Sequence, residues 1–317
     1  MATIQNLACI ATDWGTTNRR AWALDRNGVI LDRRKDACGL LAVAEGRFAE
    51  SFLAFAADWL AGDRRVPVIM SGMVGSRRGW KEAPYLPTPV TLARLSDGLC
   101  AVGPVGPATV WIVPGICRDD AAQPEVMRGE ECEILGALLA GGSEDGVFLL
   151  PGTHTKWAIV SAGRLVDFRT YMTGEVFGLL RKSGTLGQLM EGEAIDAEAF
   201  RRGLARAMAA ESGHLLHSLF SVRTLGLFER LPPAALPGYL SGLLIGSEMR
   251  DAAAWLQRRG VAARVTGIGA PALLAAYRTA AAGVDLEVTG LDSGELLPGA
   301  LFAIARAGGL LPEMGRE

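Results

Sequence analysis

The stretch ATDWGTTNRRAWAL, residues 11–24, places a tip of glycine and hydroxyl residues between two short apolar runs. The first run leads into Asp13, the tip occupies residues 15–18, and apolar alternation resumes after it. Asn-Gly at residues 27–28 is a turn signal, and a further apolar run follows at 29–31. This pattern predicts a meander of two or three antiparallel strands at the start of the chain.

The second half of the chain repeats this arrangement. GTTNR at residues 15–19 matches GTHTK at residues 152–156 in its glycine, threonine, polar and basic order. Each tip lies between two predicted strands, and the two tips are 137 residues apart, about the length of a domain. The repeat therefore predicts two related domains, residues 1–142 and 143–317, with their boundary in the glycine-rich segment GGSEDG.

Strands and helices alternate along the rest of the chain, as expected of an α/β protein with mixed sheets flanked by helices. The predicted helices span about residues 46–61, 130–140, 193–228, 239–259, 271–282 and 299–307. The predicted strands after the meander span residues 66–70, 110–114, 147–150, 261–269 and 284–288.

Composition excludes several classes of protein. Thirty-two Lys and Arg against 34 Asp and Glu give a net charge of −2, which offers no general attraction for nucleic acid or an anionic membrane. No apolar run approaches the ~20 residues of a spanning helix, and the N-terminus has no signal-peptide pattern, so we expect a cytoplasmic protein. Five cysteines without a CxxC pair, with three histidines, predict neither a zinc site nor a disulfide framework.

Both tips suit phosphate binding, because glycine lets backbone N–H groups approach an anion and the hydroxyls add donors. Arg19 or Lys156 would supply positive charge, and Asp13 could hold Mg²⁺ beside the phosphates. A single tip of this kind could equally be an ordinary turn. The candidate nucleotide-binding residues are Gly15, Thr16, Thr17, Asn18, Gly152, Thr153, His154, Thr155 and Lys156.

A third glycine turn, GIGAPA at residues 267–272, follows a predicted strand and opens a predicted helix. With Glu287 it resembles a dinucleotide-binding fingerprint and its ribose-binding acid. The same arrangement could receive an adenine and its ribose, or be only a tight turn. Gly267, Gly269 and Pro271 are the candidate contacts.

Residues 71–91 form a long segment without periodicity, and such loops inside compact domains are usually functional. Its aromatic residues could cover the carbon face of a small ligand, and its hydroxyl and arginine residues could meet hydroxyl groups and a carboxylate of that ligand. Arg77, Arg78, Arg118 and Arg128 are all available for that carboxylate. The candidate substrate-binding residues are Gly75, Ser76, Trp80, Tyr85 and Arg128.

Three glutamates, Glu130, Glu131 and Glu133, lie at the start of a predicted helix. Favourable interaction with the helix dipole explains them, at ~0.3–1 kcal/mol each. Alternatively, Glu131 or Glu130 is a base that takes a proton from a substrate hydroxyl.

Six motifs, DWGTTNRRAW, SGMVGSRRGWKEAPY, VMRGEE, LPGTHTKW, TYMTGE and LSGLLIGSE, occur in the order and spacing found in 2-dehydro-3-deoxygalactonate kinases. The chain resembles this family of the actin/hexokinase-like superfamily over nearly its whole length. The resemblance implies two RNase H-like domains around a central cleft, residues 1–142 on the sugar-acid side and 143–317 on the nucleotide side. It also implies transfer of phosphate from ATP, with Mg²⁺, to the 6-hydroxyl of a 2-keto-3-deoxy sugar acid.

The resemblance also implies roles for individual residues. Asp13 with residues 15–18 corresponds to the first phosphate hairpin, residues 152–155 to the second, and residues 267–271 to the adenosine turn. The RGEE segment is similar to the glutamate-bearing segment of exopolyphosphatases in the wider superfamily, which favours Glu131 as the base.

Other functions remain open at this stage. A phosphohydrolase of the same superfamily would use the glutamate to activate water, and a sugar-acid sensor would keep the fold without turnover. A dehydrogenase would rest on residues 267–287 alone. The stereochemistry of the acid and the oligomeric state stay open, with a homodimer as one alternative.

Overall fold

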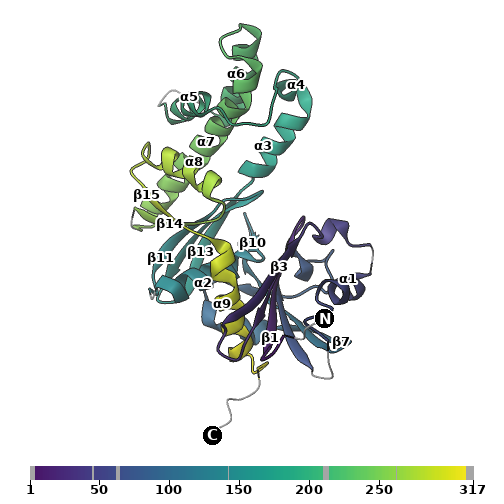
Figure 1. The fold of residues 1–317 in the computed structure, drawn as a ribbon. Helices are drawn as coiled ribbons and strands as arrows, with labels where there is room; N and C mark the ends of the chain where they lie inside the picture. Colours follow the sequence, from purple (N-terminus) through teal and green to yellow (C-terminus); the bar gives the residue numbers. More distant parts are fainter. Residues whose placement is uncertain are drawn as a thin grey trace. The chain divides into compact units, whose positions relative to one another are not determined.

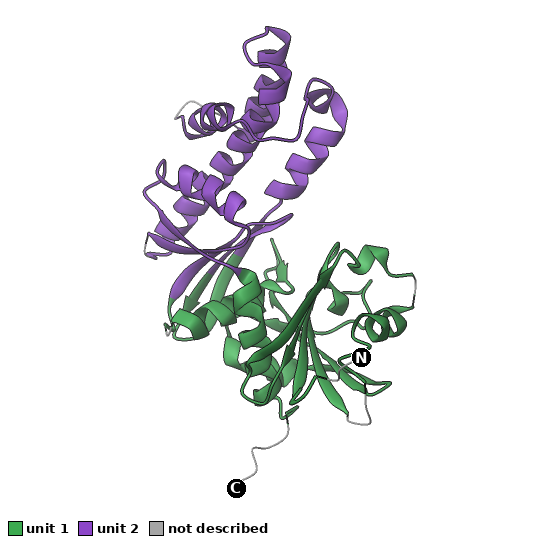
Figure 2. Ribbon diagram, viewed as in Figure 1, with its two compact units in different colours: residues 1–145, 159–168, 293–317 green, residues 146–158, 169–292 purple. Residues whose placement is uncertain are grey.

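The computed structural model describes residues 4–44, 46–61, 65–141, 143–209, 214–261 and 263–311. The chain divides into two compact units (Figure 2). Unit 1 comprises residues 1–145, 159–168 and 293–317, and unit 2 comprises residues 146–158 and 169–292. The prediction of a single boundary after Gly142, which lies outside the described residues, differs from this division because unit 1 also takes up residues 159–168 and the C-terminal segment.

Unit 1 contains a six-stranded sheet in the order β3-β2-β1-β4-β8-β7 (Figure 1). β1 pairs antiparallel with β2 and parallel with β4, and β2 pairs antiparallel with β3, so the predicted N-terminal meander is confirmed. The strands are β1 (Cys9–Trp14), β2 (Arg19–Leu24), β3 (Ile30–Asp36), β4 (Val66–Ser71), β7 (Cys100–Val105) and β8 (Ala108–Ile112).

Helices cover this sheet because its two faces carry apolar side chains. The aromatic residues Trp14, Phe48 and Phe52 belong to one buried hydrophobic cluster. Phe48 and Phe52 are the two buried residues of helix α1 (Phe48–Phe55). Helix α9 (Ser293–Ala307) packs against β1, β4 and helix α2 (Glu130–Gly141). A Cβ at Gly136 of α2 would lie 2.7 Å from the Leu296 carbonyl oxygen, so glycine is needed for the two helices to approach this closely.

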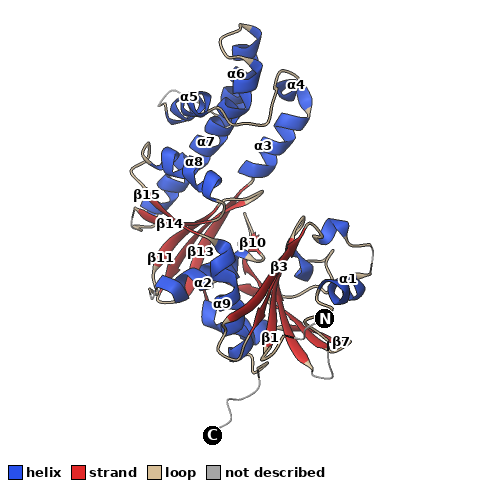
Figure 3. Cartoon of the chain, in the orientation of Figure 1, coloured by secondary structure: helices blue, strands red, loops and turns tan. Residues whose placement is uncertain are grey.

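A second six-stranded sheet has the order β15-β14-β11-β12-β13-β6 (Figure 3). β11, β14 and β15 are parallel, and the succession β13-β12-β11-β14-β15 repeats the succession β3-β2-β1-β4-β8 of the first sheet. The repeat predicted from the two tips is thus confirmed in the sheet order. The strands are β6 (Val90–Thr91), β11 (Gly146–Leu150), β12 (Thr155–Ser161), β13 (Arg164–Tyr171), β14 (Arg264–Ile268) and β15 (Glu287–Leu291).

The helices of unit 2 pack through small residues. A Cβ at Gly242 of α7 would lie 2.0 Å from the Phe200 carbonyl oxygen of α5, so these two helices touch backbone to backbone. The helical stretch predicted for residues 193–228 is two helices, and Asp196 caps the first by accepting the Ala199 N–H. The helices are α3 (Thr173–Lys182), α4 (Gly184–Gly187), α5 (Ala197–Met208), α6 (Leu215–Leu227), α7 (Leu236–Arg258) and α8 (Pro271–Ala281).

The segment predicted as a long loop, residues 71–91, contains short elements of its own. It includes the 3-10 turn η2 (Met73–Gly75) and strand β5 (Tyr85–Pro87). β5 joins a three-stranded sheet with β9 (Gly115–Arg118) and β10 (Glu125–Met127), which places the loop beside the chain entering α2. None of the described helices has the length and apolar character needed to cross a membrane.

Candidate active site

The first tip keeps its amides available. β1 ends at Trp14 and β2 begins at Arg19, and the carbonyl groups of Gly15, Thr16 and Thr17 accept N–H groups from residues 39–41 at 2.9–3.2 Å. Within the described ranges, no backbone carbonyl of a turn or loop accepts the amide of Thr16 or Thr17. Backbone amides without an internal acceptor suit an anion.

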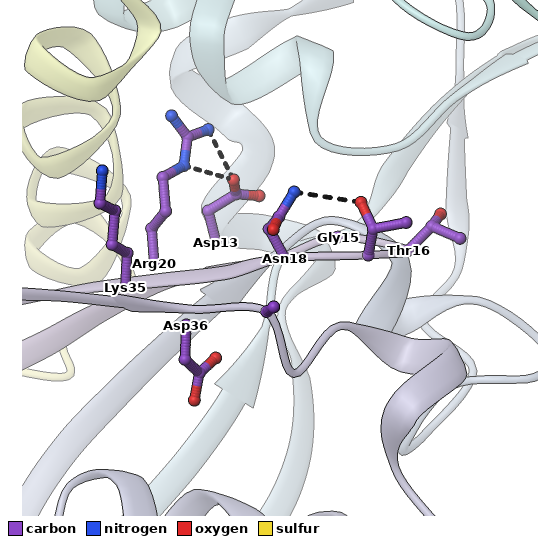
Figure 4. A pocket seen from close by; sticks show the side chains of 9 residues that line it. Asp13, Gly15, Thr16, Asn18, Arg20, Lys35 and Asp36 are labelled. Carbon is purple, nitrogen blue, oxygen red and sulfur yellow. Dashed lines mark hydrogen bonds and ion pairs between the residues drawn. The ribbon is translucent and has the colours of Figure 1, made fainter.

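A pocket of about 690 Å³ opens at this tip (Figure 4). Asp13, Arg20 and Lys35 are cross-strand neighbours on β1, β2 and β3, and Figure 4 shows their side chains on the same side of the sheet. Arg20 donates from Nε and Nη2 to Asp13 Oδ2 at 3.1 and 2.7 Å. The pocket is lined by Asp13, Gly15, Thr16, Thr17, Asn18, Arg20, Lys35, Asp36 and Ala37.

Arg19 does not supply the charge at this tip. It is only 3% exposed, and it donates from Nε and Nη2 to the two carboxylate oxygens of Asp36. Successive residues of a strand point to opposite faces, so Arg20 and not Arg19 shares a face with Asp13. The prediction for Arg19 is therefore wrong, and Lys35, which the sequence analysis did not name, joins Arg20 in the pocket.

Three carboxylates, those of Asp13, Glu130 and Glu133, lie where β1 ends and α2 begins. A Cβ at Gly72 would lie 2.9 Å from the Trp14 carbonyl oxygen and 3.0 Å from Asp13 Oδ1, and a Cβ at Gly129 would lie 3.3 Å from the Gly72 Cα atom. These glycines let the loop after β4 and the start of α2 approach Asp13. Arg20 Nη2 is 3.9 Å from Glu133 Oε1.

Asp13, Glu130 and Glu133 influence one another electrostatically. Burial, followed by the charges of Asp13 and Glu130, raises the pKa of Glu133 to about 8, and Arg20 only partly offsets this. Mg²⁺ is typically held by one or two carboxylates together with substrate phosphates. Asp13, beside the tip, fits that role, although no group of three or more ligating side chains occurs among the described residues.

The structure separates Glu130 from Glu131. Glu131 is fully buried, and both of its carboxylate oxygens accept the Gly129 N–H at 2.8 Å. Glu130 is half-buried, and its Oε2 accepts the Arg128 N–H at 2.9 Å. A base must meet the hydroxyl that it deprotonates, so this geometry favours Glu130 and not the residue that the resemblance favoured.

Glu131 is instead expected to contribute to the pH dependence of stability. Burial raises its pKa from 4.5 to about 7, so the folded state binds this proton more tightly than the unfolded chain. The resulting stabilisation is complete below about pH 4.5 and is lost as the pH rises through about 7. Glu131→Gln, measured by urea unfolding at pH 5 and pH 8, should therefore gain stability relative to the parent at the higher pH. Parallel pH profiles for the two proteins would contradict this expectation.

Four of the five predicted substrate residues lie together in unit 1. The Arg128 guanidinium stacks 4.2 Å from the Tyr85 ring, and a Cβ at Gly75 would lie 2.9 Å from Arg128 Nη1. Arg128 Nη1 and Ser76 Oγ are buried and have no hydrogen-bond partner among the described residues. Buried polar atoms without a partner are costly, and a bound polar ligand would satisfy them.

Trp80, the fifth residue, belongs to the aromatic core. Its ring lies 6.3 Å from the rings of Trp14, Phe48 and Phe52, measured between centroids. Its remaining surface lines a separate pocket of about 660 Å³. That pocket is lined by Leu40, Leu41, Val43, Gly46, Phe48, Arg77, Arg78, Gly79 and Trp80.

In unit 2 the second tip, like the first, is a connection of four residues, here between Leu150 of β11 and Thr155 of β12. Gly152, Thr153 and His154 are exposed, and His154 Nε2 lies 2.5 Å from Glu175 Oε2. Thr155 and Lys156 lie in β12, where both are buried; Lys156 Nζ donates to Thr170 Oγ1 at 2.9 Å. Lys156 Nζ thus already has a partner, and the predicted contact of Lys156 with the nucleotide phosphates stays a prediction.

The predicted adenosine turn connects β14 to α8. β11 and β14 are parallel neighbours, so the second tip and this turn leave the same edge of the sheet. Gly267 is a packing residue, since a Cβ there would lie 2.6 Å from Leu274, whereas Gly269 lies in the turn itself and Pro271 begins α8. Glu287 begins β15, at the opposite end of the parallel strands, so it cannot be the ribose-binding acid of a dinucleotide site.

The repeated sheet order, the glycine tip and the carboxylate beside it are those expected of a sugar kinase of the actin/hexokinase type. Residues 13–304 match the family model described as 2-keto-3-deoxy-galactonokinase, and the chain belongs to this family.

Two known proteins are similar over nearly their full lengths. The 2-dehydro-3-deoxygalactonokinase of Escherichia coli (strain K12) is 34% identical over 299 residues, which cover 94% of this chain and 97% of the relative. A crystal structure of a Sinorhizobium meliloti protein assigned as the same kinase superposes with a TM-score of 0.86 at 34% identity. That match covers 94% of this chain and 98% of the other.

Proposed function

We propose that this protein transfers the γ-phosphate of ATP to the 6-hydroxyl of 2-dehydro-3-deoxygalactonate. The observation that carries the proposal is the match to this kinase family, with Asp13 at the first tip and the half-buried Glu130 at the start of α2 as candidate catalytic groups. A hydroxyl acceptor needs a base, and a phosphate donor needs amides, cations and a metal-binding carboxylate. Unit 1 offers a candidate for each of these: Glu130 as base, the amides of the first tip, Arg20 and Lys35, and Asp13.

The first tip would hold the transferred phosphate, with Arg20 and Lys35 supplying positive charge. In unit 2, Gly152, Thr153 and His154 would bind ATP phosphates, and Gly269 and Pro271 would bind the adenosine. Mg²⁺ bound at Asp13 would neutralise charge on the phosphates.

Glu130 would act as the general base. As the hydroxyl oxygen attacks the γ-phosphorus, its proton would pass to the Glu130 carboxylate while the bond between the γ-phosphorus and the bridging oxygen of ADP breaks. The N–H that Arg128 donates to Glu130 Oε2 fixes the orientation of this carboxylate. Gly72 and Gly129 let the start of α2, where Glu130 is the first residue, approach the loop that contacts Asp13.

The sugar acid would lie against Ser76, Tyr85 and Arg128. Arg128 immediately precedes the Gly129–Glu130 turn, so an acid bound there is close to the proposed base. Its carboxylate would give Arg128 Nη1 the acceptor that it lacks in the described part of the chain. The separate pocket at Arg77, Arg78 and Trp80 is the alternative binding site for the sugar acid.

Arg128→Met should raise the KM for the acid at least about tenfold, because a charged hydrogen bond is lost, and leave the KM for ATP within about twofold. Arg78→Met is the matched control, since it removes an exposed arginine from the alternative pocket. The reverse pattern, with the loss at Arg78, would move the sugar acid to that pocket.

Steady-state ADP formation across a panel of 2-keto-3-deoxy sugar acids tests the proposed substrate. We expect kcat/KM to be highest for 2-dehydro-3-deoxygalactonate and negligible for acids that lack a 6-hydroxyl. Undiminished ADP formation with a 6-deoxy acid would contradict the proposed acceptor.

A further inference from the structure

A buried carboxylate in unit 2 has no role in the chemistry above. Glu248 of α7 is only 3% exposed and lies in the LSGLLIGSE motif. Its Oε1 accepts the Trp157 Nε1–H at 2.8 Å, and its Oε2 accepts the Tyr277 hydroxyl at 2.8 Å. Thr173 also donates its hydroxyl to Oε2, and the Tyr277 hydroxyl lies 3.1 Å from Thr155 Oγ1.

These partners come from the strand that follows the second tip and from two helices, α3 and α8. Thr155 begins β12, the strand that directly follows the tip, and Trp157 is on the same face two residues later. Thr173, from the TYMTGE motif, begins α3. One carboxylate thus connects the strand after the tip with the helix that packs against it.

The start of α3 contacts the tip directly. The Glu175 N–H donates to the Thr153 carbonyl oxygen at 2.9 Å, and a Cβ at Gly174 would lie 2.2 Å from the Gly152 carbonyl oxygen. Any shift of Thr173 would therefore move the backbone of Gly152 and Thr153. The tip itself is exposed, so its conformation depends on these contacts below it.

Burying a carboxyl group among neutral donors has a cost. Burial raises the pKa of Glu248 to about 7, although the hydrogen bonds from Thr173, Trp157 and Tyr277 oppose the rise. Only neutral groups donate to it among the described residues, and an apolar side chain of similar size would avoid the desolvation penalty. A fully hydrogen-bonded group of this kind fixes geometry, which an apolar core does less well.

We propose that Glu248 is a positioning residue for ATP, acting through Thr173, Tyr277 and Thr155 to fix the Gly152–Thr153 backbone for the nucleotide phosphates. This inference rests on the proposed role of the second tip. It assigns a function to two motifs that the catalytic residues leave unexplained.

Single hydroxyl deletions in the intact protein test the inference. Thr173→Val and Tyr277→Phe keep side-chain size while each removes one donor to Glu248. We expect each to raise the KM for ATP, and the Kd of a non-hydrolysable ATP analogue, about tenfold, while the KM for the sugar acid changes less than twofold. Thr173→Ser retains the hydroxyl and should restore ATP affinity.

Tyr239→Phe is the matched control, because this buried tyrosine of α7 also loses a hydroxyl contact, 2.9 Å from Ser221 Oγ, away from the tip. It should leave both KM values unchanged. Equal losses for Tyr239→Phe and Tyr277→Phe, or a fall in melting temperature without any change in ATP affinity, would overturn the positioning role.

Gly152→Val separates this inference from the proposed role of the tip. A Cβ at Gly152 meets only the His154 carbonyl oxygen, at 3.9 Å, so the variant fits the fold, and loss of ATP affinity would place nucleotide at the tip. If Gly152→Val binds ATP normally, the tip does not hold the nucleotide. If it loses ATP while Thr173→Val and Tyr277→Phe retain it, only the role of Glu248 fails.

Discussion

Glu130→Gln lowers kcat by about 10²–10⁴-fold, the range expected for loss of a positioned general base, and leaves both KM values within about threefold. Glutamine keeps the size of the side chain and its acceptor for the Arg128 N–H, so the fold and the helix start are preserved. What it cannot do is accept the proton of the attacking hydroxyl. Steady-state kinetics at saturating ATP, Mg²⁺ and sugar acid measure the effect.

Glu131→Gln is the comparison that gives this result its meaning. Glu131 is adjacent in sequence but fully buried, and Gly129 already satisfies its carboxylate. Its variant should keep kcat within about threefold of the parent, and its effect should be on stability. A large loss of kcat at Glu131 with normal turnover at Glu130 would restore the assignment that the resemblance favoured.

Asp13→Asn should lower kcat by about 10²–10³-fold at a fixed Mg²⁺ concentration, because removing preorganised charge from a phosphoryl-transfer site has effects of that size. The asparagine retains an oxygen for Arg20 but loses the negative charge that would hold the metal. The KM for Mg²⁺ should rise, and the KM for the sugar acid should stay nearly constant.

Asp58→Asn is the matched control for Asp13→Asn. Asp58 also receives two hydrogen bonds from one arginine, Arg34 of β3, but it lines neither of the two pockets described above. We expect a loss of stability with nearly unchanged kcat and KM for Mg²⁺. Equal turnover of Asp13→Asn and the parent at saturating Mg²⁺ would exclude a metal-binding role for Asp13.

The fold was largely predictable because its signals are local. The tip at residues 15–18 and its repeat at residues 152–156 are contiguous sequence patterns, and each requires a strand before and after it. The packing of α9 in unit 1 was not predictable in this way. It depends on contacts with β1 and β4, more than 200 residues earlier in the chain, which leave no local pattern in the sequence.

The candidate site was predictable by residue type but not always by position. Arg19 and Arg20 are adjacent residues of the same type, and only the strand register shows that Arg20 faces Asp13. Lys35 enters the pocket through the pairing of β2 with β3, and the sequence carries no separate signal for it. Glu248 illustrates the same limit, because its partners come from β12, α3 and α8.

Phosphorus-31 NMR of the reaction of ATP, Mg²⁺ and 2-dehydro-3-deoxygalactonate is the most direct test of the proposed activity. We predict one new phosphomonoester, coupled to the protons at C6 of the acid, that forms in equal amount with ADP and only when the acid is present. Inorganic phosphate in place of the ester, formed at the same rate without the acid, would contradict the kinase assignment and indicate a phosphohydrolase.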